Sequence, residues 1–186
     1  MTTTSRYDLQ LPEGALRIEP ISDEKIISLE ETGESEYLSA VWRPTKGRYF
    51  EMLSQEDGGY IFSMPISDLV AEMVHKEDAD CPLVDGPAAR LVFNYPMGKP
   101  SFVRMAARDG QAITWCEVIT LLAEGYAQIY GIEREALAAG GSAGRAGTGQ
   151  QSPFEIWGHD LGGLALTGFT IIKADGVTWI MPEIES

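Results

Sequence analysis

The segment that decides the fold reads Thr114-Trp-Cys-Glu-Val-Ile-Thr-Leu-Leu-Ala-Glu-Gly-Tyr-Ala-Gln-Ile-Tyr130. Its large apolar side chains recur at helical spacing, which predicts an amphipathic helix over about residues 115–130 with one side in the core. They are Trp115, Val118, Ile119, Leu122, Tyr126, Ile129 and Tyr130. Thr114 and Glu117 have the spacing of a capping box, in which each side chain bonds the other residue's backbone amide. Gly131 marks the expected end of the helix, and residues 132–139 could form a further short turn of helix.

Residues 140–153 follow as the one low-complexity stretch, with five glycines and no large apolar side chain. Such a stretch cannot bury enough surface to offset the entropy lost on ordering, so we expect a flexible loop. It also lacks the Gly-Lys-Ser or Gly-Lys-Thr ending of a phosphate-binding loop. Beyond it, residues 164–173 and 177–181 have the composition of strands, and Ala174-Asp175-Gly176 between them predicts a hairpin.

The N-terminal third reads as a series of short strands. Residues 1–14 are polar and aperiodic, which indicates a loose N-terminal arm. Five segments rich in β-branched or aromatic residues follow, separated by turn signals such as Asp57-Gly58-Gly59. They are residues 15–19, 25–30, 37–43, 48–53 and 60–64. Ser67 is placed to cap a short helix from residue 68 to about residue 75.

Strands in a run, helices in the middle and a final hairpin predict an α+β fold. We expect a mainly antiparallel sheet with one long amphipathic helix, about residues 115–130, packed on it. Residues 15–186 then form a single domain that carries the flexible loop at 140–153, because a chain of this length builds one sizeable core.

The net charge of the chain limits the classes of partner that it can bind. The 186 residues carry a formal net charge of −14, and residues 1–93 hold 18 acidic against 8 basic side chains. Residues 94–186 hold 10 against 6. A negative potential, strongest over the N-terminal half, disfavours nucleic acid and anionic membranes, since both require neutralising cations. It favours a basic protein partner, although acidity that only keeps the protein soluble remains an alternative.

The location is expected to be cytoplasmic. No apolar run approaches the ~20 residues that span a bilayer, and the first residues lack an apolar signal core. The two cysteines, Cys81 and Cys116, are 35 positions apart and fit neither a CxxC pair nor a disulfide-rich scaffold. We interpret both as reduced thiols.

The segment Trp157-Gly158-His159-Asp160 is the first candidate for chemistry. An imidazole beside a carboxylate can be oriented as a general base, and nearby glycines let a substrate approach the backbone. The alternative is structural: Trp157 packs in the core and residues 158–163 form a turn leading into the last hairpin. The sequence favours this alternative, because the segment itself contains no serine and so no Gly-x-Ser-x-Gly nucleophile elbow.

Two weaker candidates are a thiol and an acidic turn. Cys116 lies at a helix N-terminus, where a thiol is activated, although a half-buried structural thiol fits its position as well. His75, Asp78 and Asp80 are ligand types that metals accept, but their spacing fits neither HExxH nor an EF-hand, and a solvated acidic turn is the better interpretation. The sequence implies no cofactor and no metal.

The function expected from these features is that of a non-enzymatic acidic binding protein, such as an inhibitor, immunity factor or adaptor, that engages a basic protein. The alternative is a small enzyme, a hydrolase for example, with its site at His159 and Asp160. The residues predicted to bind are Glu30, Glu31, Glu34, Glu36, Trp157, His159 and Asp160.

Overall fold

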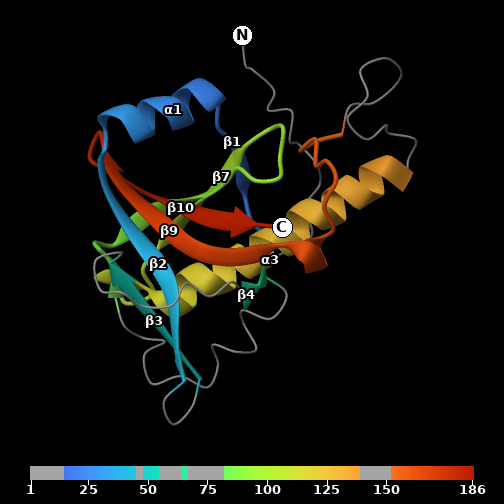
Figure 1. Ribbon diagram of the computed structural model, residues 1–186. Helices are drawn as coiled ribbons and strands as arrows, with labels where there is room; N and C mark the ends of the chain where they lie inside the picture. The colour runs from blue at the N-terminus through green and yellow to red at the C-terminus, as the bar shows by residue number, and fades with distance from the viewer. Residues whose placement is uncertain (1–14, 45–47, 55–63, 67–81, 139–151) are drawn as a thin grey trace.

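A computed structural model describes residues 15–44, 48–54, 64–66, 82–138 and 152–186. The largest element is an eight-stranded sheet with the order β1-β7-β6-β10-β9-β2-β3, in which β4 also pairs with β9 (Figure 1). All pairs in this sheet are antiparallel except β6 with β10. The strands are β1 (Ile18–Pro20), β2 (Glu34–Pro44), β3 (Arg48–Ser54), β4 (Met64–Pro65), β6 (Ala88–Phe93), β7 (Ser101–Ala106), β9 (Ala165–Ala174) and β10 (Val177–Glu185). The predicted α+β class and mainly antiparallel sheet are confirmed.

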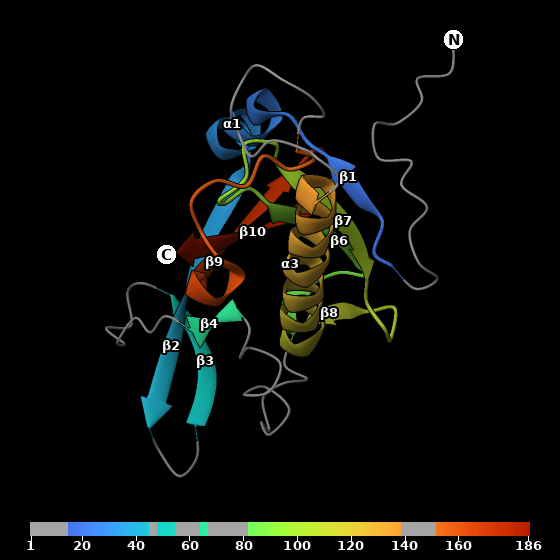
Figure 2. The same ribbon diagram turned by 90° about the vertical axis from the view of Figure 1, so that its right-hand side faces the viewer.

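Two α-helices cover opposite faces of this sheet. The long helix α3 (Trp115–Ala138) packs on the face that carries Leu91 and Phe93 of β6. The short helix α1 (Asp23–Thr32) packs on the face that carries Val92. Figures 1 and 2 show the two helices apart, with α3 running along one side of the sheet and α1 at its upper end. Because successive strand residues point to opposite faces, the central strands contribute to both cores.

The start of α3 agrees with the prediction from the sequence, but its end does not. The capping box is present: Glu117 Oε2 accepts from the Thr114 amide at 2.8 Å, and Thr114 Oγ1 accepts from the Glu117 amide at 3.3 Å. The helix continues through Gly131 to Ala138, so the prediction that Gly131 ends it is wrong. A glycine inside a helix costs about 1 kcal/mol relative to alanine. Contacts made by the turn beyond it, above all by the buried Glu133, offset that cost.

The N-terminal strands are confirmed in part. Residues 37–43 and 48–53 lie in β2 and β3, and the first strand is β1, slightly later than the predicted 15–19. The prediction of a strand at residues 25–30 is wrong, because these residues lie in α1. Ser22 caps this helix by accepting from the Lys25 amide at 3.2 Å, and Ile26 and Leu29 bury one side of it.

Several predictions lie outside the described residues. These are the arm at 1–14, the turn at 57–59, the helix from residue 68 to about 75, and positions 140–151 of the Gly-rich loop. Of the predicted strand 60–64, only Met64 is described, in β4. The last two loop positions are described, and Ser152 is buried.

The sequence missed four strands between residues 82 and 114. Two of them, β6 and β7, pair antiparallel inside the main sheet. The other two, β5 (Pro82–Asp85) and β8 (Ala112–Thr114), form a small separate sheet. The final hairpin is confirmed, and its Asp175 and Gly176 both have positive φ, as a tight two-residue turn requires. Strand β10 continues to Glu185, past the predicted end at residue 181.

Candidate functional site

The segment that carries Trp157 and His159 is held against α3 by one buried carboxylate. Glu133 is only 4% exposed, and its oxygens accept hydrogen bonds from the Ser152 hydroxyl and from the amides of Phe154 at 3.1 Å and Ile156 at 3.3 Å. A buried charge needs such partners to be tolerated. Glu133 therefore acts as a clamp for this segment. Sequence reasoning missed it, although its position four residues after Ile129 places it on the inward side of the helix.

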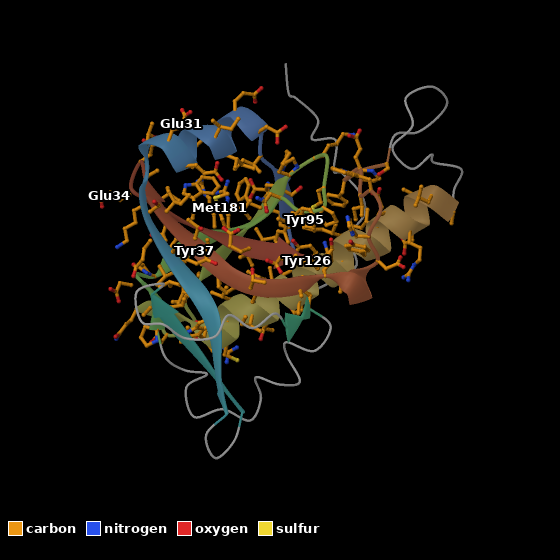
Figure 3. The ribbon with its side chains drawn as sticks, viewed as in Figure 1. Glu31, Glu34, Tyr37, Tyr95, Tyr126 and Met181 are labelled. Carbon is orange, nitrogen blue, oxygen red and sulfur yellow. The ribbon has the colours of Figure 1, made fainter. Side chains whose placement is uncertain are left out.

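His159 contacts a tyrosine and not its neighbouring aspartate. Its Nε2 lies 3.2 Å from the Tyr95 hydroxyl, which also lies 2.8 Å from Ser186 Oγ. The backbone carbonyl of His159 accepts from the Tyr130 hydroxyl at 3.0 Å. Figure 3 places Tyr95 beside the C-terminal end of β10. Asp160 is exposed, and the described contacts include no hydrogen bond between it and His159.

The tyrosines around His159 act as protonated donors. Burial, followed by the negative charge of Asp160 and the nearby Tyr95, raises the pKa of Tyr130 to about 12. Burial likewise raises the pKa of Tyr126, whose hydroxyl donates to the Tyr95 carbonyl at 2.7 Å. Both phenols therefore stay neutral near pH 7 and fix the backbone on either side of the imidazole. The arrangement can hold and orient His159, and it leaves Asp160 to solvent.

Trp157 does not pack in the core. Its side chain is 62% exposed, so the predicted burial of this residue is wrong. Positive φ angles at Glu155 and Gly158 turn the backbone so that Phe154 and Leu164 fill the core instead. The turn expected at residues 158–163 is present as an irregular segment that ends in the short helix η3 (Leu161–Gly163) before β9. An exposed tryptophan beside a half-buried histidine is available for contact with a partner.

Cys116 lies apart from His159, at the first turn of α3. It is half-buried and lines a hollow of about 320 Å³ with Arg108, Asp109, Thr114 and Glu117. Burial by itself raises the pKa of Glu117, but hydrogen bonds from Thr114 and Arg108 outweigh burial and lower the net pKa. The Glu117 carboxylate is thus ionised and hydrogen-bonded within the capping box.

His75, Asp78 and Asp80 lie outside the described residues. Within the part of the chain that the structure describes, no three His, Cys, Asp or Glu side chains are grouped so that they could hold a metal ion.

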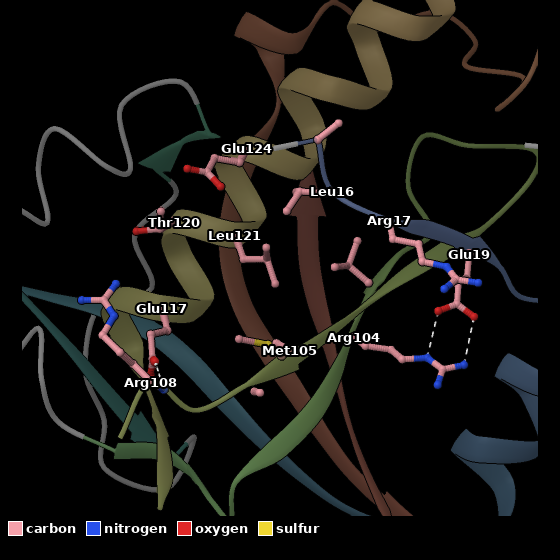
Figure 4. Close-up of a pocket in the computed structure, with 13 residues that line it drawn as sticks. Leu16, Arg17, Glu19, Arg104, Met105, Arg108, Glu117, Thr120, Leu121 and Glu124 are labelled. Atoms are coloured by element: carbon pink, nitrogen blue, oxygen red, sulfur yellow. Dashed lines mark hydrogen bonds and ion pairs between the residues drawn. The ribbon is translucent and has the colours of Figure 1, made fainter. Parts of the chain in front are cut away.

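A groove of about 670 Å³ opens between α3, β1 and β7 (Figure 4). Its lining includes Leu16 and Leu121, and its charged side chains are three arginines and three glutamates. Arg104 Nε lies 2.8 Å from Glu19, and the Arg108 amide donates to Glu117 at 2.6 Å. The groove thus presents both signs of charge without a clear excess of either.

The predicted acidic binding residues on α1 and β2 lie close together. Glu30 and Glu31 occupy the last turn of α1, and Glu34 and Glu36 begin β2 directly after it. All four side chains are exposed, and Figure 3 shows Glu31 and Glu34 projecting outward at the same corner of the molecule. We call these four residues the acidic corner. The structure separates the acidic corner, along the sheet, from the Trp157–Asp160 segment that the sequence grouped with it as binding residues.

Within the described ranges no helix is long and apolar enough to cross a membrane. Comparison with known proteins finds no matching family model, curated protein or solved structure.

Proposed function

We propose that this chain is a non-enzymatic acidic binding protein, of the kind that acts as an inhibitor, immunity factor or adaptor, and that its N-terminal half engages a basic protein. The proposal includes a cytoplasmic location, which the free thiol of Cys116 supports. The observation that carries the proposal is the position of Glu30 and Glu31 at the C-terminal end of α1.

A helix C-terminus carries a partial negative charge from its unpaired carbonyl groups, so carboxylates there are unfavourable and lysine or arginine would be favourable. The last turn of α1 contains no basic residue. The ion pairs among the described residues also leave Glu30 and Glu31 without a cationic partner. These carboxylates therefore weaken the isolated fold, by about 0.3–1 kcal/mol each. A basic partner would supply the missing cations.

The net charge of −14 supports the same partner. A surface of one sign raises the rate of encounter with an oppositely charged protein and disfavours other partners, and both effects weaken as salt screens the charges. Binding should consequently be strongest at low ionic strength.

The test uses the immobilised protein and the proteins of source-cell extract that a cation-exchange resin retains. We expect a basic protein to bind at low salt, and its affinity to fall steeply as salt rises. A variant with Glu30→Gln, Glu31→Gln and Glu34→Gln should bind it more weakly. A control variant loses three exposed carboxylates elsewhere, at Asp85, Glu124 and Glu135.

The control variant should keep most of the affinity, because the removed charges lie outside the acidic corner. Equal loss in both variants would mean that only net charge matters, and it would contradict a specific site. Failure of every basic protein to bind the wild type at low salt would refute the proposed function.

A second candidate function is a small enzyme centred on His159. The observation in its favour is the imidazole bonded to Tyr95 beside the exposed Trp157. It ranks second because the described contacts of Asp160 do not include the imidazole that it would have to orient. Native mass spectrometry distinguishes the two functions: a bound small molecule that is lost in His159→Ala would favour the enzyme.

A further inference from the structure

One isoleucine on the outer side of α1 is surrounded by carboxylates. Ile27 is 51% exposed. On a helix, the side chains nearest to residue i are those at i−4, i−3, i+3 and i+4. For Ile27 these positions are all acidic, namely Asp23, Glu24, Glu30 and Glu31. We call these five residues the α1 outer face.

This face points away from the sheet. Ile26 and Leu29 are the buried residues of α1, and they pack with Val92 and Trp179 in the core beneath it. Ile27 and its four acidic neighbours are all exposed. In Figure 1, no described helix or strand is drawn beyond α1 on its outward side. Among the residues that the structure describes, the α1 outer face is therefore a helix surface without a packing partner, and its centre is apolar.

Among the described residues, no ion pair neutralises the carboxylates of this face. Lys25, the helix's one lysine, extends to Asp175 on the β9–β10 turn, 3.2 Å away. Hydrogen bonds from its own backbone amide and from Ser22 lower the pKa of Glu24, so this group stays ionised well below neutral pH. Four negative charges around one apolar side chain are the complement of a basic surface with an apolar pocket.

Single exposed apolar residues are common and by themselves need no explanation. Among the described residues, the other large ones are Leu137 and Trp157. Leu137 has Glu133 and Arg134 at its preceding helical positions, and Glu133 is buried. Ile27 differs because the residues at all four neighbouring helical positions are acidic and exposed. Protein interfaces have this arrangement, with an apolar anchor at the centre and a polar rim that excludes water.

We propose that the α1 outer face is the docking surface for the basic partner, with Ile27 inserted into an apolar pocket ringed by lysine or arginine. This inference rests on the proposed function and adds the site and the recognition chemistry. The rim supplies attraction and orientation through charge, and Ile27 supplies affinity through burial.

The test measures the Kd of the basic protein retained from source-cell extract for wild type, Ile27→Ala and Leu137→Ala by fluorescence anisotropy across a salt series. We expect Ile27→Ala to raise the Kd roughly 4- to 12-fold, because the variant no longer buries the exposed half of an isoleucine side chain in the interface. The salt slope should stay unchanged, since no charge is removed. Leu137→Ala should leave the Kd within about twofold.

Ile27→Ala is expected to fold normally, because the side chain is half exposed and alanine is a good helix former; a matching melting curve verifies this. A Kd that Ile27→Ala does not change, while the triple glutamine variant weakens binding, would refute the docking surface and leave the proposed function standing. If Trp157→Ala weakens binding and Ile27→Ala does not, the docking surface on α1 is refuted, and the partner binds the Trp157 segment instead. No retained basic protein at all would refute both proposals.

Discussion

Reversing the charge at the C-terminal end of α1 should make the protein more stable. Glu30→Lys combined with Glu31→Lys removes two unfavourable interactions with the helix dipole and introduces two favourable ones. Each interaction is worth about 0.3–1 kcal/mol, and values near the lower limit apply because both residues are exposed. The total is about 1–2 kcal/mol. For a domain of 150–250 residues this raises Tm by roughly 2–8 °C.

The assay is calorimetric melting at low and at high salt. The increase in Tm should be smaller at about 0.5 M salt, because salt screens charges at an exposed helix end. Glu24→Lys is the matched control: it makes the same substitution in the first turn, where a carboxylate is favourable, and should lower Tm. Binding of the basic protein should fall in the double variant. A double variant that melts below wild type would show that Glu30 and Glu31 stabilise the fold, and it would remove the observation on which the proposed function rests.

Three further predictions test how the rest of the structure is held. Glu133→Gln replaces one accepting oxygen by an NH₂ group and leaves at least one of three donors unpaired, so urea unfolding should show a loss of about 1–3 kcal/mol. Gly125→Ala should destabilise by about 1–3 kcal/mol despite its better helix propensity, because the new methyl group overlaps the buried Phe93 ring; unchanged stability would contradict this packing. Asp160→Asn should lower the pKa of Tyr130 from about 12, measured by absorbance at alkaline pH. The raised pKa of Tyr130 contributes stability below pH 10 that is lost as pH rises toward 12, so the variant should lose less stability over this range, and its loss should be complete at a lower pH.

The sequence predicted the elements whose local signals agree with their tertiary contacts. Helix α3 combines a capping box with a continuous apolar side, and the β9–β10 hairpin combines two strand segments with an Asp-Gly turn. The strands β6 and β7 were missed because both faces of the sheet are covered there. Their side chains then show no alternation, and only tertiary packing identifies them. Residues 25–30 were misassigned because β-branched composition outweighed the Ser22 cap.

The candidate site was predictable only in its parts. Acidic residues of the N-terminal half could be named from the sequence, but the ring around Ile27 depends on α1 being a helix. If this segment were a strand, successive side chains would point to opposite faces, and Ile27 would not have its present neighbours. Trp157 was misplaced because the turn at Glu155 and Gly158 requires positive φ angles that composition does not reveal. The clamp at Glu133 depends on a segment about twenty residues further along the chain.

Docking of the basic partner on the α1 outer face is tested most directly by zero-length carbodiimide cross-linking between the two proteins, with the linked residues identified by mass spectrometry. This reaction joins a carboxylate to a lysine amine only where the two are in contact. We expect cross-links from the α1 outer face, at Asp23, Glu24, Glu30 or Glu31. Cross-links from Glu124 or Glu135, with none from α1, would contradict docking there.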